Sequence, residues 1–276
     1  MGKKRRILVA VLLLTVIGGV AWLALRPPQP QEPVYQGKRL SVWLNDYWVL
    51  GSGYPGAGVL ISNNNHKVDI VVRQIGINAI PTLFRMLTAA DPPTTKLDFF
   101  LAKHDVYNGR FISTPLAFEK HVQAACAFRA LGAEARGAVP RLIDMYDRSL
   151  DWESQTLVAF ALGGIGPPAS NAVPSLLRSL TNAGSSNVSY NTLRALGEIH
   201  ADPKNVVPIL IKFLKNPDVN VRMKTIRSLQ AFATDAEPAV PALVESLADE
   251  VDYIRKGAAE ALKIIDPEAA AKAGVQ

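Results

Sequence analysis

The chain has 276 residues, 49% of them hydrophobic, which is enough to bury one or two substantial cores. Its formal net charge is +6, from 30 basic and 24 acidic residues, but residues 1–26 hold five of the basic residues and no acidic one. The rest of the chain carries 25 basic and 24 acidic residues, so its net charge gives no reason to expect nucleic-acid binding. The single cysteine, Cys126, excludes a disulfide within the chain and an N-terminal lipoprotein.

The N-terminal region has the features of a membrane anchor. A basic tail, residues 1–6, precedes the uncharged run 7–25, which as a helix would reach about 28 Å, close to the hydrocarbon thickness of a bilayer. The basic flank predicts a cytoplasmic N-terminus and an extracytoplasmic C-terminal domain at a bacterial inner (cytoplasmic) membrane. The alternative is a secretory signal cleaved at Gly19-Val20-Ala21, which would give a secreted or periplasmic protein.

A linker and a cap are expected next. Residues 26–40 are rich in proline and predict an extended spacer. Within residues 41–64 we expect a helix over 42–50, N-capped by Ser41, and a glycine-rich loop. One apolar stripe at helical spacing consists of Trp43, Leu44, Tyr47 and Trp48. The stripe is typical of a helix that covers the end of a helical stack, and the alternative is an aromatic binding platform.

From residue 65 to residue 267 one pattern returns at a nearly constant interval. The motif Val-Pro-x-Leu occurs four times, and its evenly spaced prolines are Pro140, Pro174, Pro208 and Pro241. Apolar residues at helical spacing lie on both sides of each proline, which predicts two helices per repeat with the proline in the first turn of the second. Such a period indicates stacked supersecondary units. The distance along the chain from Pro81 to Pro140 is much longer than this interval, which indicates an insertion at 88–114.

Short motifs within the repeats point to a family. Ala-Leu-Gly occurs at 130–132, 161–163 and 195–197, and Asn-Pro-Asp-Val-Asn-Val-Arg at 216–222 leads into a first helix, as does the related segment 249–255. These motifs resemble HEAT repeats of the short bacterial kind, similar to those of phycobilisome lyases. The resemblance implies an all-α fold, namely an α-solenoid of about five to six helical hairpins, with Leu-Gly-Gly-Ile-Gly at 162–166 as a lengthened turn.

The same resemblance leaves two features open. Ser189 and Gln155 stand where the motif has Arg222 and Arg255, which argues against a continuous arginine ladder. Lyase activity would imply a pigment-binding site, but no residues identify one.

The insertion at 88–114 carries a group of aromatic residues. They are Phe99, Phe100, Tyr107 and Phe111. Because insertions into repeats often lie on the binding face, these residues are candidates for contact with a partner protein. The alternative is that they fold back on the adjacent hairpin, since large apolar clusters are rarely exposed.

The second helices supply another candidate surface. The position four after each proline reads Arg85, Asp144, Arg178, Lys212 and Glu245. With their neighbours, the basic residues that could receive an acidic segment of a partner are Arg141, Arg148, Arg178, Lys212 and Lys215. The alternative is a solvated face of alternating sign.

Catalytic chemistry has little support in the sequence. No two of the four histidines lie within one helical turn of each other, and no nucleotide-binding or nucleophile motif occurs. We therefore predict no catalytic residue, no metal site and no cofactor, and interpret the chain as a membrane-anchored, non-catalytic protein-binding or scaffolding module. The alternative is a lyase-like enzyme or enzyme accessory with a pocket near the insertion, where His104 or His121 would lie beside a carboxylate. A last helix is expected over 252–265, followed by a tail, 268–276, that frays.

Overall fold

The computed structural model describes residues 31–47, 49–50, 60–61, 66–90, 116–148, 152–182 and 190–275. The chain divides into two units, Met1–Glu32 and Pro33–Gln276, and all the helices and strands described belong to the second. The predicted anchor at 7–25 lies outside the described residues, as does the alternative cleavage site.

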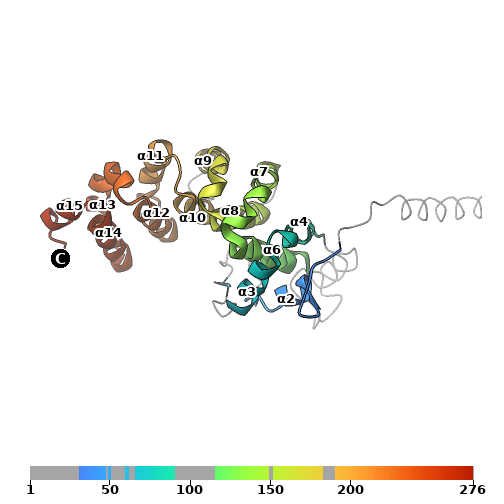
Figure 1. Ribbon diagram of the computed structural model, residues 1–276. Helices are drawn as coiled ribbons and strands as arrows, with labels where there is room; N and C mark the ends of the chain where they lie inside the picture. The colour runs from blue at the N-terminus through green and yellow to red at the C-terminus, as the bar shows by residue number, and fades with distance from the viewer. Residues whose placement is uncertain are drawn as a thin grey trace, which may run out of the picture. The chain divides into compact units, whose positions relative to one another are not determined.

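Six pairs of consecutive helices make up the described residues from His66 onward (Figure 1). The pairs are α3 (His66–Ile75) with α4 (Ile80–Leu87), α6 (Leu116–Leu131) with α7 (Val139–Arg148), α8 (Trp152–Ile165) with α9 (Val173–Asn182), α10 (Tyr190–Ile199) with α11 (Pro203–Phe213), α12 (Val219–Ala231) with α13 (Val240–Ser246), and α14 (Asp252–Ile265) with α15 (Pro267–Lys272). Each first helix packs against the first helix of the next pair, from α6 through α8, α10 and α12 to α14. This mostly helical arrangement is consistent with the predicted α-solenoid.

A residue with positive φ joins the two helices of five pairs. These residues are Gly76 (φ 62°), Gly132 (55°), Gly166 (76°), His200 (49°) and Ala233 (46°). In four pairs a 3-10 helix follows, namely η1 (Gly76–Ala79), η2 (Gly132–Ala138), η3 (Pro167–Ala172) and η4 (Ala233–Ala239). Glycine adopts the left-handed conformation without a steric penalty, whereas a side chain makes it unfavourable. The left-handed conformation is therefore sterically less favourable at His200 and Ala233 than at the three glycines.

This turn position corrects the interpretation of the Ala-Leu-Gly motifs. Gly163 and Gly164 are still inside α8, and the turn begins only at Gly166. Gly197 is likewise inside α10, whereas Gly132 is itself the turn residue. The copy at 130–132 is therefore not equivalent to the other two, although all three read alike in the sequence.

The role predicted for proline holds in four pairs and is wrong in one. The second helix begins one residue before Pro81, Pro140, Pro174 and Pro241. In contrast, α11 begins at Pro203, so that Pro208 lies inside it. The earlier start is stabilised by Asn205, whose Nδ2 donates to Oδ2 of Asp202 at 2.8 Å. Pro208 then leaves one carbonyl of the first turn without a helical donor.

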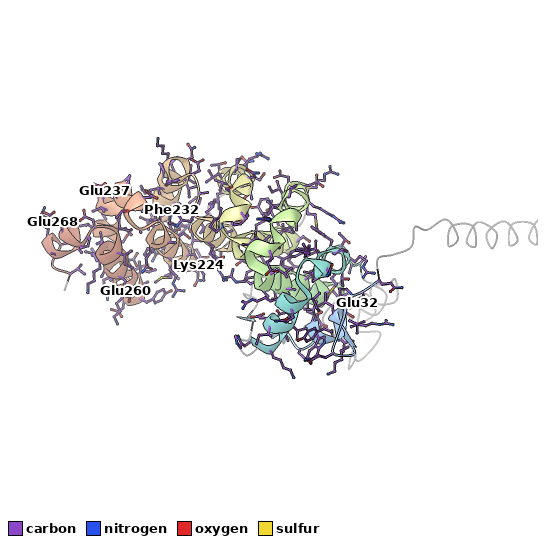
Figure 2. The ribbon with its side chains drawn as sticks, in the orientation of Figure 1. Glu32, Lys224, Phe232, Glu237, Glu260 and Glu268 are labelled. Atoms are coloured by element: carbon purple, nitrogen blue, oxygen red, sulfur yellow. The ribbon has the colours of Figure 1, made fainter. Side chains whose placement is uncertain are left out.

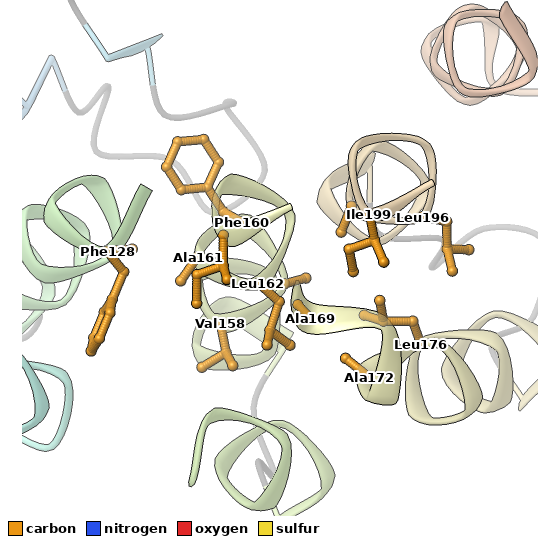
Figure 3. Close-up of a cluster of buried hydrophobic side chains, with 14 of the residues drawn as sticks. Phe128, Val158, Phe160, Ala161, Leu162, Ala169, Ala172, Leu176, Leu196 and Ile199 are labelled. Carbon is orange, nitrogen blue, oxygen red and sulfur yellow. The ribbon is translucent and has the colours of Figure 1, made fainter. Parts of the chain in front are cut away.

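The interior of the repeats is filled by small and branched apolar side chains. Figure 3 shows this packing around α8, where Phe128, Leu162, Leu176 and Leu196 are fully buried. Alanines such as Ala161 allow the helices to approach closely. Because every pair buries its apolar side chains against the next, the core is continuous along the row.

The N-terminal cap is shorter than predicted and is not wholly helical. The helix expected over 42–50 is α2 (Leu40–Leu44), with Arg39 rather than Ser41 at the N-cap position. After a turn, β3 (Val49–Leu50) pairs antiparallel with β4 (Leu60–Ile61). Before it, β1 (Val34–Tyr35) pairs with β2 (Lys38–Arg39). The all-α prediction is therefore corrected, because the cap contains two short antiparallel strand pairs. In the β3–β4 pair, backbone amide and carbonyl groups are hydrogen-bonded between strands and not within a longer helix.

The segment around α2 lies against the first two helix pairs. Helix α2 packs against α3 and α6. Three residues of the predicted stripe, Trp43, Leu44 and Tyr47, are buried, which argues against an aromatic binding platform. Trp48 lies outside the described residues.

The prediction of a fraying C-terminal tail is wrong. Asp266 caps α15 by accepting a hydrogen bond from the amide of Ala269 at 3.0 Å, and Pro267 occupies the first turn. Ala270 is buried, and Val275 packs against the core. Asp-Pro therefore ends α14 and at once starts a short helix that covers the last pair.

Within the described residues, His66–Leu87 has the length and hydropathy of a membrane span. It consists of α3, η1 and α4, interrupted by the left-handed turn at Gly76. Val72 and Leu83 in it are fully buried in the common core. The apolar character of this segment is thus accounted for by packing within the repeats.

Candidate protein-binding surface

The basic residues predicted on the second helices lie among acidic ones. Arg148 pairs with Asp144 one turn away in α7, with Nε 2.7 Å from Oδ1. Arg178 of α9 lies 3.5 Å from Asp147 of α7. In a third pair, Lys215 Nζ is 2.7 Å from Glu245 Oε2 of α13. Both signs therefore alternate along this face, and whether a partner binds there stays a prediction.

The other predicted contact residues have different surroundings. The guanidinium of Arg141 lies over the ring of Phe84, 4.1 Å from its centroid. Lys212 is exposed and makes no ion pair with any described residue. The aromatic residues of the insertion, Phe99, Phe100, Tyr107 and Phe111, lie outside the described residues.

Sequence reasoning missed a cationic surface on the first helices, which begins around Phe160. Figure 3 shows Phe160 on the side of α8 opposite to Val158, away from the core shared with the second helices. Phe160 as a residue is nevertheless only 8% exposed, because two arginines cover its ring. The guanidinium carbons of Arg129 from α6 and Arg194 from α10 each lie 5.1 Å from its centroid. Such cation–π contacts fix both arginines on the outer side of α8.

Both arginines bind one carboxylate, that of Glu198 in α10. Arg129 donates from Nη1 to Oε2 at 2.7 Å and from Nη2 to Oε1 at 2.8 Å. Arg194 donates from Nε to Oε1 at 2.8 Å. Burial alone would raise the pKa of Glu198, but the hydrogen bonds from the two arginines outweigh it and lower the pKa below its ordinary value. Glu198 is therefore held as a carboxylate with both oxygens engaged.

Two glycines of α8 make this bridge possible. A Cβ at Gly164 would lie 2.4 Å from Cγ of Arg129, and one at Gly163 would lie 2.7 Å from Oε2 of Glu198. Arg129 and Glu198 thus meet across α8 because the helix has no side chain at these two positions. Gly163 and Gly164, which were predicted to be part of a lengthened turn, instead form a part of the α8 surface that has no side chains.

The surface continues onto α12 with Lys224 and Arg227. Burial and the neighbouring cations Arg227 and Arg194 lower the pKa of Lys224 by more than the nearby carboxylate of Glu198 raises it. Neither Lys224 nor Arg227 forms an ion pair with a described residue. We call Arg129, Arg194, Lys224 and Arg227 the first-helix cationic face.

A periodic signal in the sequence could have identified this face. Phe160, Arg194 and Arg227 follow one another at the same intervals as the prolines of three consecutive repeats. They therefore occupy equivalent positions on consecutive first helices. Glu260 takes this position in the next repeat, so the run of cations ends at α14. In Figure 2, Lys224 and Glu260 lie on the same side of the row of helices, with Glu237 on the other.

Two of the candidates for chemistry, His121 and Cys126, lie among the described residues. Nε2 of His121 lies 2.9 Å from the backbone oxygen of Ala89 rather than beside a carboxylate. His104 lies outside the described residues. Cys126 is buried, which raises the pKa of its thiol to about 12. The described part of the chain holds no group of three or more His, Cys, Asp or Glu residues placed to bind a metal ion.

Comparison with known proteins identifies the repeats. A family profile of HEAT repeats matches residues 173–263, which confirms the expected repeat type there. The chain resembles a designed armadillo repeat protein in complex with the peptide (KR)4, with 15% identity, a TM-score of 0.46, and coverage of 87% of this chain and 100% of that chain. A second designed armadillo repeat protein is 15% identical, with a TM-score of 0.45 and coverage of 83% and 100%. An engineered protein is 20% identical, with a TM-score of 0.44 and coverage of 75% and 93%. No curated protein matches the chain.

Proposed function

We propose that this chain, which carries HEAT repeats at residues 173–263, is a non-catalytic protein-binding or scaffolding module anchored at a membrane. One observation supports the binding role above the others. Most apolar side chains of the helix pairs are buried by packing one pair on the next, so the exterior is left to recognise partners. That exterior bears charged residues in register across consecutive helices.

The anchoring part of the proposal comes from the sequence. Residues 7–25 contain no charge and follow the basic cluster at 3–6, and a proline-rich spacer separates them from the folded unit. The repeats would then lie on the extracytoplasmic side of a bacterial cytoplasmic membrane. If the segment is instead a cleaved signal, the mature protein is secreted or periplasmic.

Alkaline carbonate extraction separates these two possibilities. The intact chain is expected to stay in the membrane pellet, and a variant that lacks residues 7–25 is expected not to. N-terminal sequencing of the purified protein provides the second readout. A mature N-terminus near residue 22, together with release by carbonate, would show that the anchor is wrong while leaving the binding role intact.

The binding role is tested by chemical cross-linking and co-purification of the intact, anchored protein. We expect a reproducible partner protein, and we expect Arg178→Glu combined with Lys212→Glu to reduce its recovery if the second-helix face contributes. Glu237→Lys provides a control on an exposed residue of η4. Recovery of no specific partner by the wild-type chain would contradict the proposed function. Undiminished recovery in the double variant would remove only the second-helix face.

A further inference from the structure

We propose that the first-helix cationic face binds an acidic segment of the partner protein through its aspartate or glutamate carboxylates. The inference rests on the proposed function, because it specifies the chemistry of the partner and the place where it docks. The face consists of Arg129, Arg194, Lys224 and Arg227, together with the paired Glu198.

The first reason is an imbalance of charge. Arg129, Arg194 and Lys224 lie near a single acidic side chain, Glu198, and the fourth cation, Arg227, lies near Lys224. Both oxygens of Glu198 already accept hydrogen bonds from Arg129 and Arg194. Lys224 and Arg227 therefore share α12 without an ion pair to a described residue, although Glu198 is near enough to attract Lys224. Mutual repulsion between them is relieved when an anion binds.

The second reason is that the face already holds one carboxylate. Arg129 binds Glu198 with both Nη atoms, the bidentate geometry in which a guanidinium matches a carboxylate best. Arg227 has the same position in α12 that Arg194 has in α10. The position in α12 that corresponds to Glu198 is occupied by Ala231, so α12 has no glutamate there. A carboxylate from outside the chain would supply on α12 what Glu198 supplies on α10.

The third reason distinguishes an acidic peptide from other polyanions. The chain after residue 26 carries 25 basic and 24 acidic residues, so it has no strong overall field to attract nucleic acid or an anionic bilayer. The cationic run is also short, since Glu260 takes the equivalent position on α14. Adjacent packed helices lie about 8–10 Å apart, a distance that about three residues of an extended peptide span. A few carboxylates at this spacing are sufficient to engage the face.

The test uses the full-length chain purified in detergent and two fluorescein-labelled 12-residue peptides. One peptide has Glu at every third position, and the matched peptide has Gln there. Fluorescence anisotropy is measured at low and at physiological ionic strength. We expect binding of the Glu peptide only, with an affinity that falls as salt is added.

Charge-neutralising variants locate the site. Lys224→Gln combined with Arg227→Gln is expected to weaken binding of the Glu peptide about tenfold or more, since two direct ion pairs are lost. Lys204→Gln combined with Arg136→Gln removes the same charge from exposed positions on α11 and η2 and is expected to change affinity by less than about twofold, because salt screens distant charges. Thermal unfolding of both variants should match the wild type, since Arg227 is exposed and Lys224 is half-buried.

Several results would overturn the inference. An equal loss in both double variants would show that only net charge matters. Binding of an RNA oligonucleotide or of phosphatidylglycerol vesicles without binding of the Glu peptide would show that the occupant is not a protein. If the wild-type chain recovers a partner and Lys224→Gln with Arg227→Gln recovers it equally, this docking site is wrong while the proposed function stands. If the wild-type chain recovers no partner at all, the proposed function itself fails.

Discussion

Two consecutive joints between repeats solve the same packing problem with different chemistry. At the first joint, between α10 and α12, Gly197 lies so close to α12 that a Cβ there would be 2.9 Å from Cα of Ser228. Ser228 Oγ in turn donates to the backbone oxygen of Leu193 at 2.7 Å. Tyr190 adds a hydrogen bond from its hydroxyl to Asp218, the N-cap of α12. This joint is a close backbone contact stabilised by hydrogen bonds from uncharged hydroxyl groups.

The second joint, between α12 and α14, depends on an ion pair. Arg222 is almost buried, with 9% of its side chain exposed, and its Nε lies 2.9 Å from Oδ2 of Asp249. The same guanidinium donates from Nη1 to the backbone oxygen of Asn216 at 3.0 Å, which ties the entry turn of α12 to that of α14. Gly257 of α14 faces side-chain atoms of α12, of which the flexible end of Met223 is the nearest. The repeat thus sets the positions of the helices, but each joint can be held by a different set of groups.

Truncation of the buried arginine should have the largest effect. We expect Arg222→Ala to lower the free energy of unfolding by about 3 kcal/mol, because Asp249 loses its partner in a mostly buried site. Arg255 makes the same contact with its own turn, donating to the backbone oxygen of Asp249 at 2.7 Å, but 39% of its side chain is exposed. Arg255→Ala should therefore cost about 1 kcal/mol. Urea unfolding measures both, and equal losses would contradict the special role of the second joint.

Adding a methyl group at a glycine should lower the free energy of unfolding at the first joint but not at the second. Gly197→Ala places a Cβ against the backbone of Ser228 and is expected to destabilise by about 1–2 kcal/mol, because α10 and α12 must move apart. At Gly257 the new Cβ would meet Cε of Met223 at 3.1 Å, and this side chain can move aside. Gly257→Ala should then be neutral or stabilising by up to about 1 kcal/mol through helix propensity. Destabilisation of the same size by both changes would show that the two joints are equally tight.

Removal of the tyrosine hydroxyl tests the first joint with a smaller change. Tyr190→Phe is expected to cost about 1 kcal/mol at neutral pH. The hydrogen bond from Tyr190 is the main reason that the pKa of Asp218 is below its ordinary value. A lowered carboxyl pKa stabilises the fold above the ordinary pKa, and this contribution is lost as the pH falls through the lowered value. The difference between wild type and variant should therefore shrink in acid, and a difference that grows there would contradict this assignment.

The smallest expected effect concerns the turn within the α12–α13 pair. Ala233 has a φ of 46°, in a column where three other pairs have glycine. Ala233→Gly is expected to stabilise the protein by about 0.5–1 kcal/mol by relieving the left-handed strain. Ala259→Gly, inside α14, serves as the control and should destabilise by about 1 kcal/mol. Thermal unfolding of both variants provides the comparison, and a loss of stability in Ala233→Gly would show that the turn is not strained.

Much of the helical arrangement could be predicted, and the errors have identifiable causes. The prolines mark four of the second helices because a residue without an amide hydrogen suits a first turn. Pro208 misleads because Pro203 offers an earlier start with the same property. The copies of Ala-Leu-Gly mislead because glycine serves two purposes, a left-handed turn at Gly132 and a close helix contact at Gly197. Local sequence does not distinguish these two uses.

The sequence by itself determined the repeat interval, the helical pairs and the side of each helix that is buried, because all of these follow from local spacing of apolar residues and prolines. The tertiary structure alone decided which distant groups meet. Arg129 and Glu198 are far apart in the sequence, and they bind each other only because α8 between them lacks side chains at Gly163 and Gly164. The second-helix cations, in turn, are close to acidic residues such as Asp147 and Glu245 that the stacking brings to them. The periodic pattern determines which side chains lie on each face of a helix. Which of these side chains bind each other depends on the distances between helices, and no local sequence pattern contains those distances.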